Sequence, residues 1–232
     1  MNFINSAIQF FKDGGFFLYP LLLIFVVGVA IAIERWIYLT KETIKNRNLW
    51  EDVAPHLGAG NFKQAITLAN NSSAQIGTVL KYGLARLATA RRRDDIQQAM
   101  EESLLEIVPR LEKRTHYLSS LANIGMLVGL LGTIIGLIHA FGAVSQANPA
   151  EKAALLAAAI SVAMNNTASG LFVAITLLLA HMFLESKTTA LIDSLEIAVV
   201  KFLNSITERY TEPAAPSPGP AMAPRAPAPR PA

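Results

Sequence analysis

Residues 117–150 read YLSSLANIGMLVGLLGTIIGLIHAFGAVSQANPA and contain no Lys, Arg, Asp or Glu. Two further stretches share this property, residues 14–33 and residues 153–184. Each stretch is at least 20 residues long, which is the length that an α-helix needs to cross about 30 Å of hydrocarbon. We therefore predict an all-α integral membrane protein with three transmembrane helices.

The composition of the 232-residue chain agrees with this prediction. Hydrophobic residues make up 52% and charged residues only 16%, against about 25% charged residues in ordinary soluble domains. The sequence has no cysteine, which excludes disulfides, zinc–thiolate sites, iron–sulfur clusters and a cysteine nucleophile. The net charge of +3 does not indicate a nucleic-acid partner, because membrane proteins collect basic residues in their cytoplasmic loops.

Basic residues indicate the orientation of the three helices. Residues 41–114 hold 12 Lys or Arg against 9 acidic residues, whereas the connection between the second and third stretches holds only Lys152, beside Glu151. The positive-inside rule puts the long loop and the C-terminal segment in the cytoplasm and the N-terminus and the short turn outside. A signal peptide is an alternative for the first stretch, but its positive n-region is missing, because Lys12 is offset by Asp13.

Apolar stripes at helical spacing continue beyond the membrane segments. They comprise Ile96, Met100, Leu104, Ile107 and Leu111 before the second span, and Leu191, Leu195, Ala198, Val199, Phe202 and Ile206 after the third. We predict that the first stripe belongs to a helix that runs without interruption, apart from Pro109, into the second span. The polar faces mix both charge signs, which favours a packed cytoplasmic stalk over helices that lie on anionic lipid.

The remaining sequence offers no catalytic constellation. The four histidines, His56, His116, His139 and His181, form no H-x-x-x-H pair, and no glycine-rich phosphate loop follows a strand pattern. We predict a protein that is not an enzyme and that needs no metal or cofactor. From Glu212 the chain is rich in Pro and Ala, which predicts a disordered or polyproline-like tail.

Four glycines of the second stretch, Gly125, Gly129, Gly132 and Gly136, recur at spacings of 4, 3 and 4. Glycine is common in membrane helices, but this spacing gathers the four on one face without side chains. The backbone of a neighbouring helix can pack closely against such a face. We predict a helix-packing role for these glycines and for Gly170 in the third stretch.

The third stretch carries five polar residues in mid-membrane: Ser161, Asn165, Asn166, Thr167 and Ser169. Polar groups in hydrocarbon need partners or water, so such residues usually face protein or an aqueous path. Two interpretations stay open, the lining of an ion path and hydrogen bonds that only hold helices together. No span carries Asp, Glu, Lys or Arg, so a carboxylate that carries protons would have to come from a partner.

Residues 129–137 (GLLGTIIGL) and 167–175 (TASGLFVAI) closely resemble the paired signatures of the MotA/TolQ/ExbB family. Glu34 and Arg35 match the end of that family's first membrane helix, and we expect them to anchor it at the interface. The three spans fit the TolQ/ExbB branch better than the four-span MotA branch. The resemblance implies a subunit of a bacterial inner-membrane rotary motor, a homopentamer around two single-span ExbD/TolR-like partners that supply the ion-carrying aspartate.

The resemblance also implies roles for individual residues. Thr133 and Thr167 match the family's pore threonines, which face the partner's aspartate. Their hydroxyls can donate to a carboxylate and can accept a hydrogen bond from water. We expect Asn166, Asn165 and Ser161 to complete the ion path.

Two positions depart from the family pattern. Val162 stands where the family has a glutamate five residues before Thr167, and Thr176 stands where it has a proline. The chain therefore lacks a titratable group of its own in the predicted pore. Protons carried by the partner's aspartate alone, or sodium held by hydroxyl, amide and carbonyl oxygens, are both compatible with the sequence.

The expected function is to use the proton or sodium motive force to energise an envelope process, through a TonB/TolA-like or motility protein. TonB-dependent import, Tol-Pal function and gliding motility all fit the resemblance. A passive membrane scaffold is the alternative, and a small-solute transporter is disfavoured because we find no inverted repeat. The predicted segments are a periplasmic N-terminal segment (1–13), transmembrane helix 1 (14–36), a cytoplasmic helical loop (37–116), transmembrane helix 2 (117–142), a periplasmic turn (143–152), transmembrane helix 3 (153–184), a cytoplasmic helix (185–211) and a tail (212–232).

Overall fold

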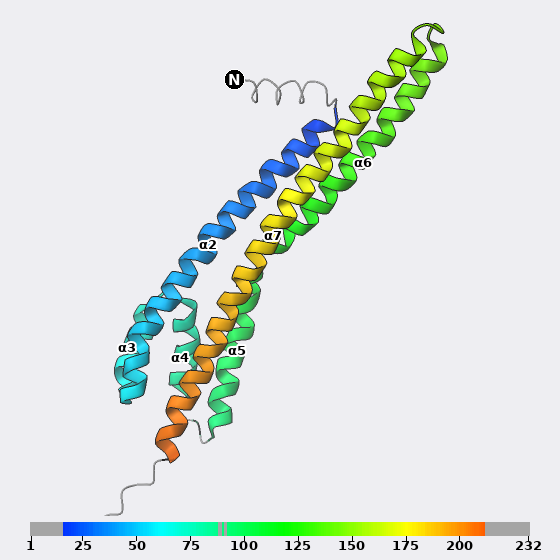
Figure 1. The fold of residues 1–232 in the computed structure, drawn as a ribbon. Helices are drawn as coiled ribbons and strands as arrows, with labels where there is room; N and C mark the ends of the chain where they lie inside the picture. Colours follow the sequence, from blue (N-terminus) through cyan, green and yellow to red (C-terminus); the bar gives the residue numbers. More distant parts are fainter. Residues whose placement is uncertain (1–15, 88–89, 91, 212–232) are drawn as a thin grey trace, which may run out of the picture.

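The computed structural model describes residues 16–87, 90 and 92–211, and the regular structure of these residues is entirely α-helical. The helices are α2 (Leu18–Ala59), α3 (Phe62–Asn71), α4 (Gln75–Leu87), α5 (Arg93–Glu112), α6 (Thr115–Gln146) and α7 (Lys152–Thr211). The predicted segments 1–13 and 212–232 lie outside the described residues. The long helices α2, α6 and α7 pack side by side, and α3, α4 and α5 pack at one end of them (Figure 1).

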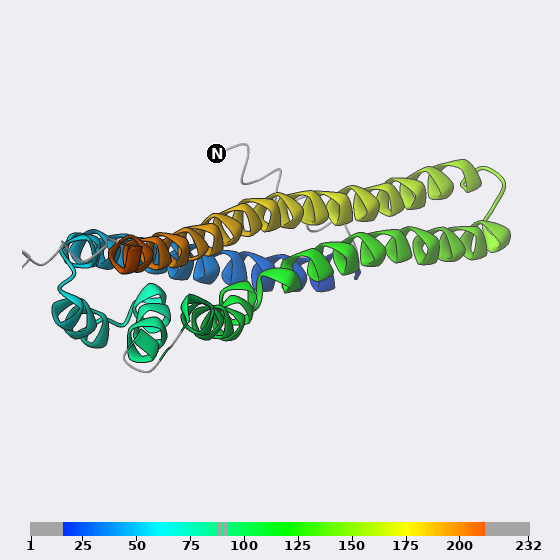
Figure 2. The ribbon, with the colours of Figure 1, turned by 90° about the horizontal axis from the view of Figure 1, so that it is seen from below.

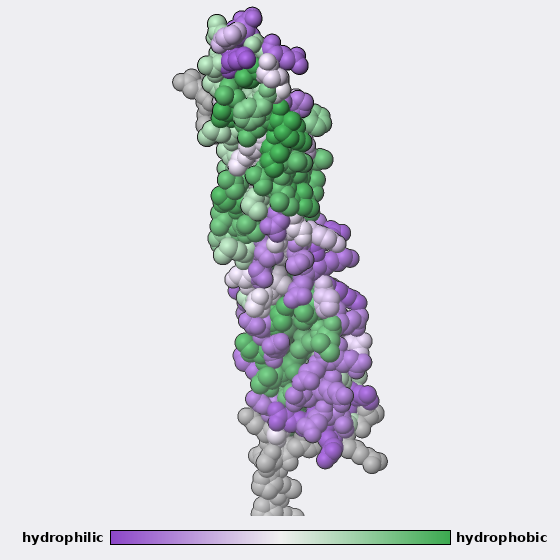
Figure 3. All heavy atoms as spheres, turned by 90° about the vertical axis from the view of Figure 1, so that its right-hand side faces the viewer, coloured by the Kyte–Doolittle hydropathy of each residue, from purple (hydrophilic) through white to green (hydrophobic). Residues whose placement is uncertain are grey.

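The prediction of an all-α protein with three candidate membrane helices is confirmed. Within the described residues, three helical segments are long and apolar enough to cross a membrane, and they fall in α2, α6 and α7. Only 17%, 22% and 33% of their most apolar windows are buried within the chain. Figure 3 shows the resulting apolar band, with polar surface on both sides of it. Apolar surface of this extent needs a nonpolar surrounding.

Helices α6 and α7 form a long antiparallel hairpin (Figure 2). Its turn lies at residues 147–151, and α7 continues past the start of α6 as a single helix of 60 residues. All residues of both predicted apolar stripes are buried, with Met100 and Phe202 at 0% exposure. The prediction that these stripes pack against protein is therefore confirmed.

The prediction of an uninterrupted helix into the second span is wrong. Helix α5 ends at Glu112 and α6 begins at Thr115, and Arg114 between them adopts a left-handed conformation with φ 69°. Pro109 lies inside α5 and does not end it. The break allows α5 to pack against α4 and α7, while α6 follows α7 toward the turn (Figure 1).

The end of α2 is encoded locally. Gly60 has φ 73°, and its N–H points to the carbonyl oxygens of His56 and Leu57. Glycine adopts this left-handed conformation at low cost, which makes it the common residue after a helix. Asn61 then accepts a hydrogen bond from the backbone N–H of Gln64 and so begins α3.

Candidate functional site

The glycine stripe of α6 lies against α7, and we call this contact the seam. A Cβ atom on Gly129 would lie 2.8 Å from the Cα of Gly170 and 2.9 Å from the carbonyl oxygen of Asn166. A Cβ atom on Gly170 would lie 3.0 Å from the carbonyl oxygen of Gly125. The two backbones therefore touch, and neither glycine has room for a side chain.

The remaining glycines of the stripe also face α7. A Cβ atom on Gly132 would lie 3.1 Å from the Cβ of Asn166, and one on Gly136 would lie 3.4 Å from the Cβ of Ala163. The second distance is an ordinary contact between carbon atoms. The seam is thus tightest near Gly129 and loosens toward the turn.

The structure brings Thr133 of α6 and Thr167 of α7 together across the seam. Their hydroxyls are hydrogen-bonded to each other, and the Thr133 hydroxyl also lies 3.2 Å from the carbonyl oxygen of Ala163 and 3.3 Å from that of Gly129. Both side chains are partly buried. They form a compact group of oxygen atoms that can donate to or accept from a passing group.

Asn166 lies within the seam itself. It is 3% exposed and its side chain contacts the face of α6 at Gly132. Its amide oxygen has no hydrogen-bond partner among the residues that the structure describes. Because buried polar atoms are nearly always hydrogen-bonded, this oxygen marks a second polar position inside the apolar region.

Asn165 and Ser161 do not join the threonine pair. Successive residues of an α-helix are about 100° apart, which turns both residues roughly 120–160° away from Thr167 around α7. Ser161 is exposed, and the backbone carbonyl of Asn165 accepts a hydrogen bond of 2.7 Å from the Ser169 hydroxyl. The polar residues of the third span therefore lie on different sides of α7.

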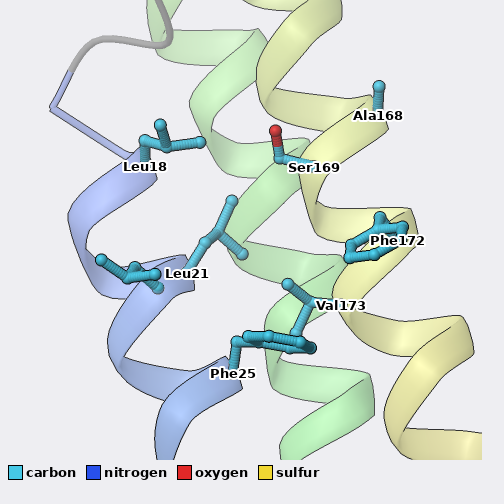
Figure 4. Close-up of a pocket in the computed structure, with 8 residues that line it drawn as sticks. Leu18, Leu21, Phe25, Ala168, Ser169, Phe172 and Val173 are labelled. Carbon is cyan, nitrogen blue, oxygen red and sulfur yellow. The ribbon is translucent and has the colours of Figure 1, made fainter. Parts of the chain in front are cut away.

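Ser169 faces a groove of about 460 Å³ between α2 and α7 (Figure 4). The rest of the lining is apolar: Leu18, Leu21, Leu22, Phe25, Ala168, Phe172 and Val173. The single hydroxyl is already bonded to its own helix. The groove is therefore suited to hydrocarbon rather than to an ion.

Glu34 and Arg35 hold the break between α5 and α6. The Glu34 carboxylate lies 2.5 Å from Nη1 of Arg114, and Nη2 of Arg35 donates to the carbonyl oxygen of Leu111 in the last turn of α5. Arg35 is 4% exposed, and its guanidinium lies 4.9 Å from the ring centroid of Tyr38. A cation at a helix C-terminus satisfies unpaired carbonyls and complements the helix dipole.

Thr115 and Glu185 were not anticipated from the sequence. Together with His181 they line a polar pocket at the end of the seam opposite the turn. Thr115 precedes Thr133 on α6 by five full helical turns, and Glu185 follows Thr167 on α7 by the same interval. Because a whole number of turns returns to the same side of a helix, each shares a helix face with one threonine of the pair.

The chemistry of the seam is that of neutral oxygen atoms. Within residues 16–87, 90 and 92–211, no group of three or more His, Asp or Glu side chains is arranged to hold a metal ion. Hydroxyl, amide and carbonyl groups can exchange hydrogen bonds with water, a carboxylic acid or a cation. The hydroxyl, amide and carbonyl groups of the seam supply no general acid–base pair.

Comparison with known proteins agrees with this chemistry. Residues 71–197 match the MotA/TolQ/ExbB proton channel family. The chain is 26% identical over 203 residues to a biopolymer transport protein ExbB homolog of Methanothermobacter thermautotrophicus, across 85% of this chain and 69% of that protein. It is 30% identical over 173 residues to an ExbB-like biopolymer transport protein of Synechocystis sp., across 73% of this chain and 81% of that protein.

A third relative matches over a shorter stretch. The Tol-Pal system protein TolQ of Haemophilus influenzae is 34% identical over 94 residues, across 40% of this chain and 41% of that protein. The family match covers more than half of the chain and includes both threonine-bearing motifs. The chain therefore belongs to the MotA/TolQ/ExbB proton channel family.

Proposed function

We propose that the chain is the ion-conducting scaffold subunit of an inner-membrane rotary motor driven by the ion motive force. The observation that carries this proposal is the hydroxyl pair of Thr133 and Thr167, on facing helices whose spans have no charged side chain. Such a pair can meet a carboxylic acid or a partly hydrated cation. The uncharged spans leave the ion carrier to a partner.

The chain is a multi-pass protein of the bacterial inner membrane, as TolQ and ExbB homologues are. The family consists of transport and channel scaffolds rather than enzymes, and its members work with partners of the ExbD/TolR kind. In the orientation that we propose, the N-terminus and the α6–α7 turn are periplasmic. The end of the molecule that contains α3, α4 and α5 is then cytoplasmic.

Exposed apolar side chains at the α3–α5 end support a ring of several copies. Leu105 of α5 is 76% exposed, and Ile197 and Val200 of α7 are 54% and 55% exposed. Leu105 precedes the uncharged stretch 117–150, and Ile197 and Val200 follow the uncharged stretch 153–184, so all three lie outside the predicted spans. Large apolar side chains in this position favour burial against another protein surface. We propose a homopentamer that surrounds two single-span ExbD/TolR-like helices.

In this proposal the partner's aspartate carries the ion past Thr133 and Thr167. The chain has no membrane carboxylate of its own, since Val162 stands at the position of the family's glutamate. One elementary charge that crosses 100 mV releases about 2.3 kcal/mol, so a few ions can drive a step that breaks several contacts. The proton is the ion that we propose, and sodium bound by neutral oxygen atoms is the alternative.

We further propose that the motor energises an envelope process through a TonB/TolA-like or motility protein. TonB-dependent import, Tol-Pal function and gliding motility are the three forms of this proposal. Relatives named as biopolymer transport proteins and as TolQ of the Tol-Pal system support the first two forms. No nucleic-acid partner is part of the proposal.

The hydroxyl pair also favours a second candidate function, a passive helical scaffold. In that case the bond between Thr133 and Thr167 only holds α6 against α7, as hydrogen bonds between membrane helices commonly do. The two candidates differ in what the loss of a hydroxyl does. An ion path loses conduction, whereas a scaffold loses assembly.

Thr133→Val and Thr167→Val test the proposal, because valine keeps the shape of threonine and removes its hydroxyl. Each variant, co-expressed with its ExbD/TolR-like partner, is expected to form a complex of five copies and two partners. Native mass spectrometry measures this composition. Ion-driven envelope work, measured in cells that depend on the complex, is expected to be abolished.

The matched control is Thr176→Val. Thr176 lies two and a half turns after Thr167, and its hydroxyl bonds the carbonyl oxygen of Phe172 at 2.8 Å. It therefore faces away from the threonine pair, and its variant is expected to keep full activity. Wild-type activity in both pore variants would disprove the ion path, and loss of assembly in both would favour the scaffold.

A further inference from the structure

A polar pocket of about 330 Å³ lies between α6 and α7 at the α3–α5 end of the seam. Its lining includes two glutamates, two histidines and two buried threonines: Glu112, Thr115, His116, His181, Glu185 and Thr188. No His, Asp, Glu, Lys or Arg lies between His116 and Thr133 on α6, or between Thr167 and His181 on α7. On this side of the threonine pair, the pocket is where the seam first meets histidines and carboxylates.

Thr115 gives the pocket an unpaired polar group. It is 5% exposed, and its hydroxyl has no hydrogen-bond partner in the part of the chain that the structure describes. The hydroxyl of neighbouring Thr188, in contrast, donates to the carbonyl oxygen of Leu184 at 2.9 Å. A buried hydroxyl without a protein partner is stable when water bonds it, and the pocket has room for several water molecules.

The pocket and the threonine pair lie on one line. Thr115 shares a face of α6 with Thr133, and Glu185 shares a face of α7 with Thr167, each at a spacing of five full turns. At a pitch of about 5.4 Å per turn, this spacing corresponds to about 27 Å along each helix. Since α6 and α7 are antiparallel, the same displacement on both helices leads from one site to the other.

His181 is the pocket histidine that has a carboxylate beside it. Its Nδ1 lies 3.5 Å from Oε2 of Glu185, and the two side chains are 16% and 66% exposed. Glu112 faces the same pocket from the end of α5, and His116 faces it from the start of α6. An imidazole in this setting has a wet side toward solvent and an anion that can pair with its charged form.

Two cations close to the pocket in sequence, Lys187 and Arg114, are bound elsewhere. Lys187 donates to the Thr40 hydroxyl at 2.6 Å and lies 4.4 Å from the centroid of the Trp36 ring. Arg114 pairs with Glu34 at 2.5 Å. Lys113, which follows Glu112 in the sequence, is exposed and is not among the lining residues, so the lining of the pocket holds no Lys or Arg.

We propose that this pocket is the cytoplasmic proton-exchange site of the ion path, with His181 as the group that exchanges the proton. The proposal rests on the ion-conducting function proposed above. The His181 imidazole accepts a proton from hydronium in the pocket, which leaves water and an imidazolium paired with Glu185. The imidazolium then releases the proton to cytoplasmic water and returns to its neutral form.

His181→Gln tests this role, because glutamine keeps a hydrogen-bonding side chain but cannot exchange a proton in the physiological pH range. The complex with its ExbD/TolR-like partner is reconstituted in liposomes, and proton flux under an imposed gradient is followed with a trapped pH-sensitive dye. We expect flux to fall about tenfold, less than the roughly 100-fold contribution of an irreplaceable proton-transfer group, because pocket water remains. Added imidazole is expected to restore most of the flux.

Three further variants make the result decisive. His56→Gln is the matched control in the last turn of α2, outside the pocket, and is expected to leave flux unchanged. Glu185→Gln, at a largely exposed position, should give a smaller loss and provides the test if His181→Gln does not assemble. Proton flux in Thr133→Val tests the ion path at the threonine pair, separately from the exchange site at His181.

The outcomes divide clearly. Wild-type flux in His181→Gln, or a loss that imidazole does not restore, overturns the exchange site while leaving conduction through the threonine pair intact. A wild-type complex that moves no protons, or moves only sodium, overturns the exchange site as well. Unchanged flux in Thr133→Val alone counts against the threonine path and not against His181.

Discussion

The seam between α6 and α7 and the contact among α4, α5 and α7 are built by opposite means. In the seam, Gly129 and Gly170 bring two backbones so close that a Cβ atom would lie 2.8 Å from a Cα atom. In the other contact, Gly83 is covered by the large side chains of Met100 and Phe202, which are both 0% exposed. One region excludes a methyl group, and the other depends on large groups to fill it.

The difference follows from the surroundings of each region. In a membrane the hydrophobic effect does not drive helices together, so close van der Waals contact between small residues holds them. In water, the burial of Met100 and Phe202 is itself stabilising. Helix α7 takes part in both contacts and passes from one kind of packing to the other without a break.

Phe202→Ala should have the largest effect of the changes considered for this comparison. The phenylalanine is completely buried, so its loss removes apolar burial and leaves a cavity, at a cost of about 3–5 kcal/mol in the free energy of unfolding. Hydrogen exchange of the purified complex should reveal faster opening of α4 and α5 while α6 stays protected. Ile44→Ala, at a side chain that is 51% exposed, is the control, and equal losses in both variants would contradict the comparison.

Gly170→Ala should have an intermediate effect, although it adds a single carbon atom. Its Cβ would lie 2.8 Å from the Cα of Gly129, and backbone atoms cannot move aside, so we expect a loss of about 1–3 kcal/mol. Thermal unfolding of the complex in detergent measures this loss. The matched control is Gly142→Ala on α6, where nothing lies within 4 Å of the added atom. A seam that tolerates alanine at 170 as well as at 142 is not close-packed.

Glu34→Gln should have the smallest effect. It tests the break at Arg114, where the α4–α5–α7 contact and the seam meet. The carboxylate and Arg114 are 53% and 47% exposed, so the pair is worth about 0.2–1 kcal/mol. Thermal unfolding at low salt should detect the loss, and about 1 M salt should remove it by screening. The control is Glu106→Gln, whose partner Arg110 lies on the same helix. A loss that persists at high salt would mean that Glu34 acts through packing.

The long helices could be predicted from the sequence because their causes are local. Stretches without charge predict the spans. The three- and four-residue spacing of apolar residues predicts the buried faces of α5 and α7. The break at Arg114 could not be predicted in this way, since arginine has no preference for left-handed conformation. The contacts that hold the break join distant residues: Glu34 and Arg114 are 80 residues apart, and Arg35 and Leu111 are 76 apart.

The candidate site likewise has features that the sequence predicts and features that depend on tertiary contacts. The polar residues of the third span are visible in the sequence, and the helical period alone separates Thr167 from Asn165. Which of them meets α6 depends on the contact between Gly129 and Gly170, and this contact is tertiary. Thr115 and Thr133 lie on one face of α6 because they are five turns apart. This spacing links the pocket to the threonine pair only once α6 and α7 are known to pack together at Thr133 and Thr167.

Helix α7 has a mechanical consequence. Sixty residues without a break make a rod about 90 Å long, whose ends lie in two different environments. A rod of this kind acts as a lever, because a tilt of a few degrees near the α6–α7 turn displaces its far end by several ångströms. The chain of α5 and α6 beside it has a joint at Arg114. Helix α7 therefore transmits displacement along its whole length, whereas α5 and α6 beside it meet at a break that Glu34 and Arg35 hold.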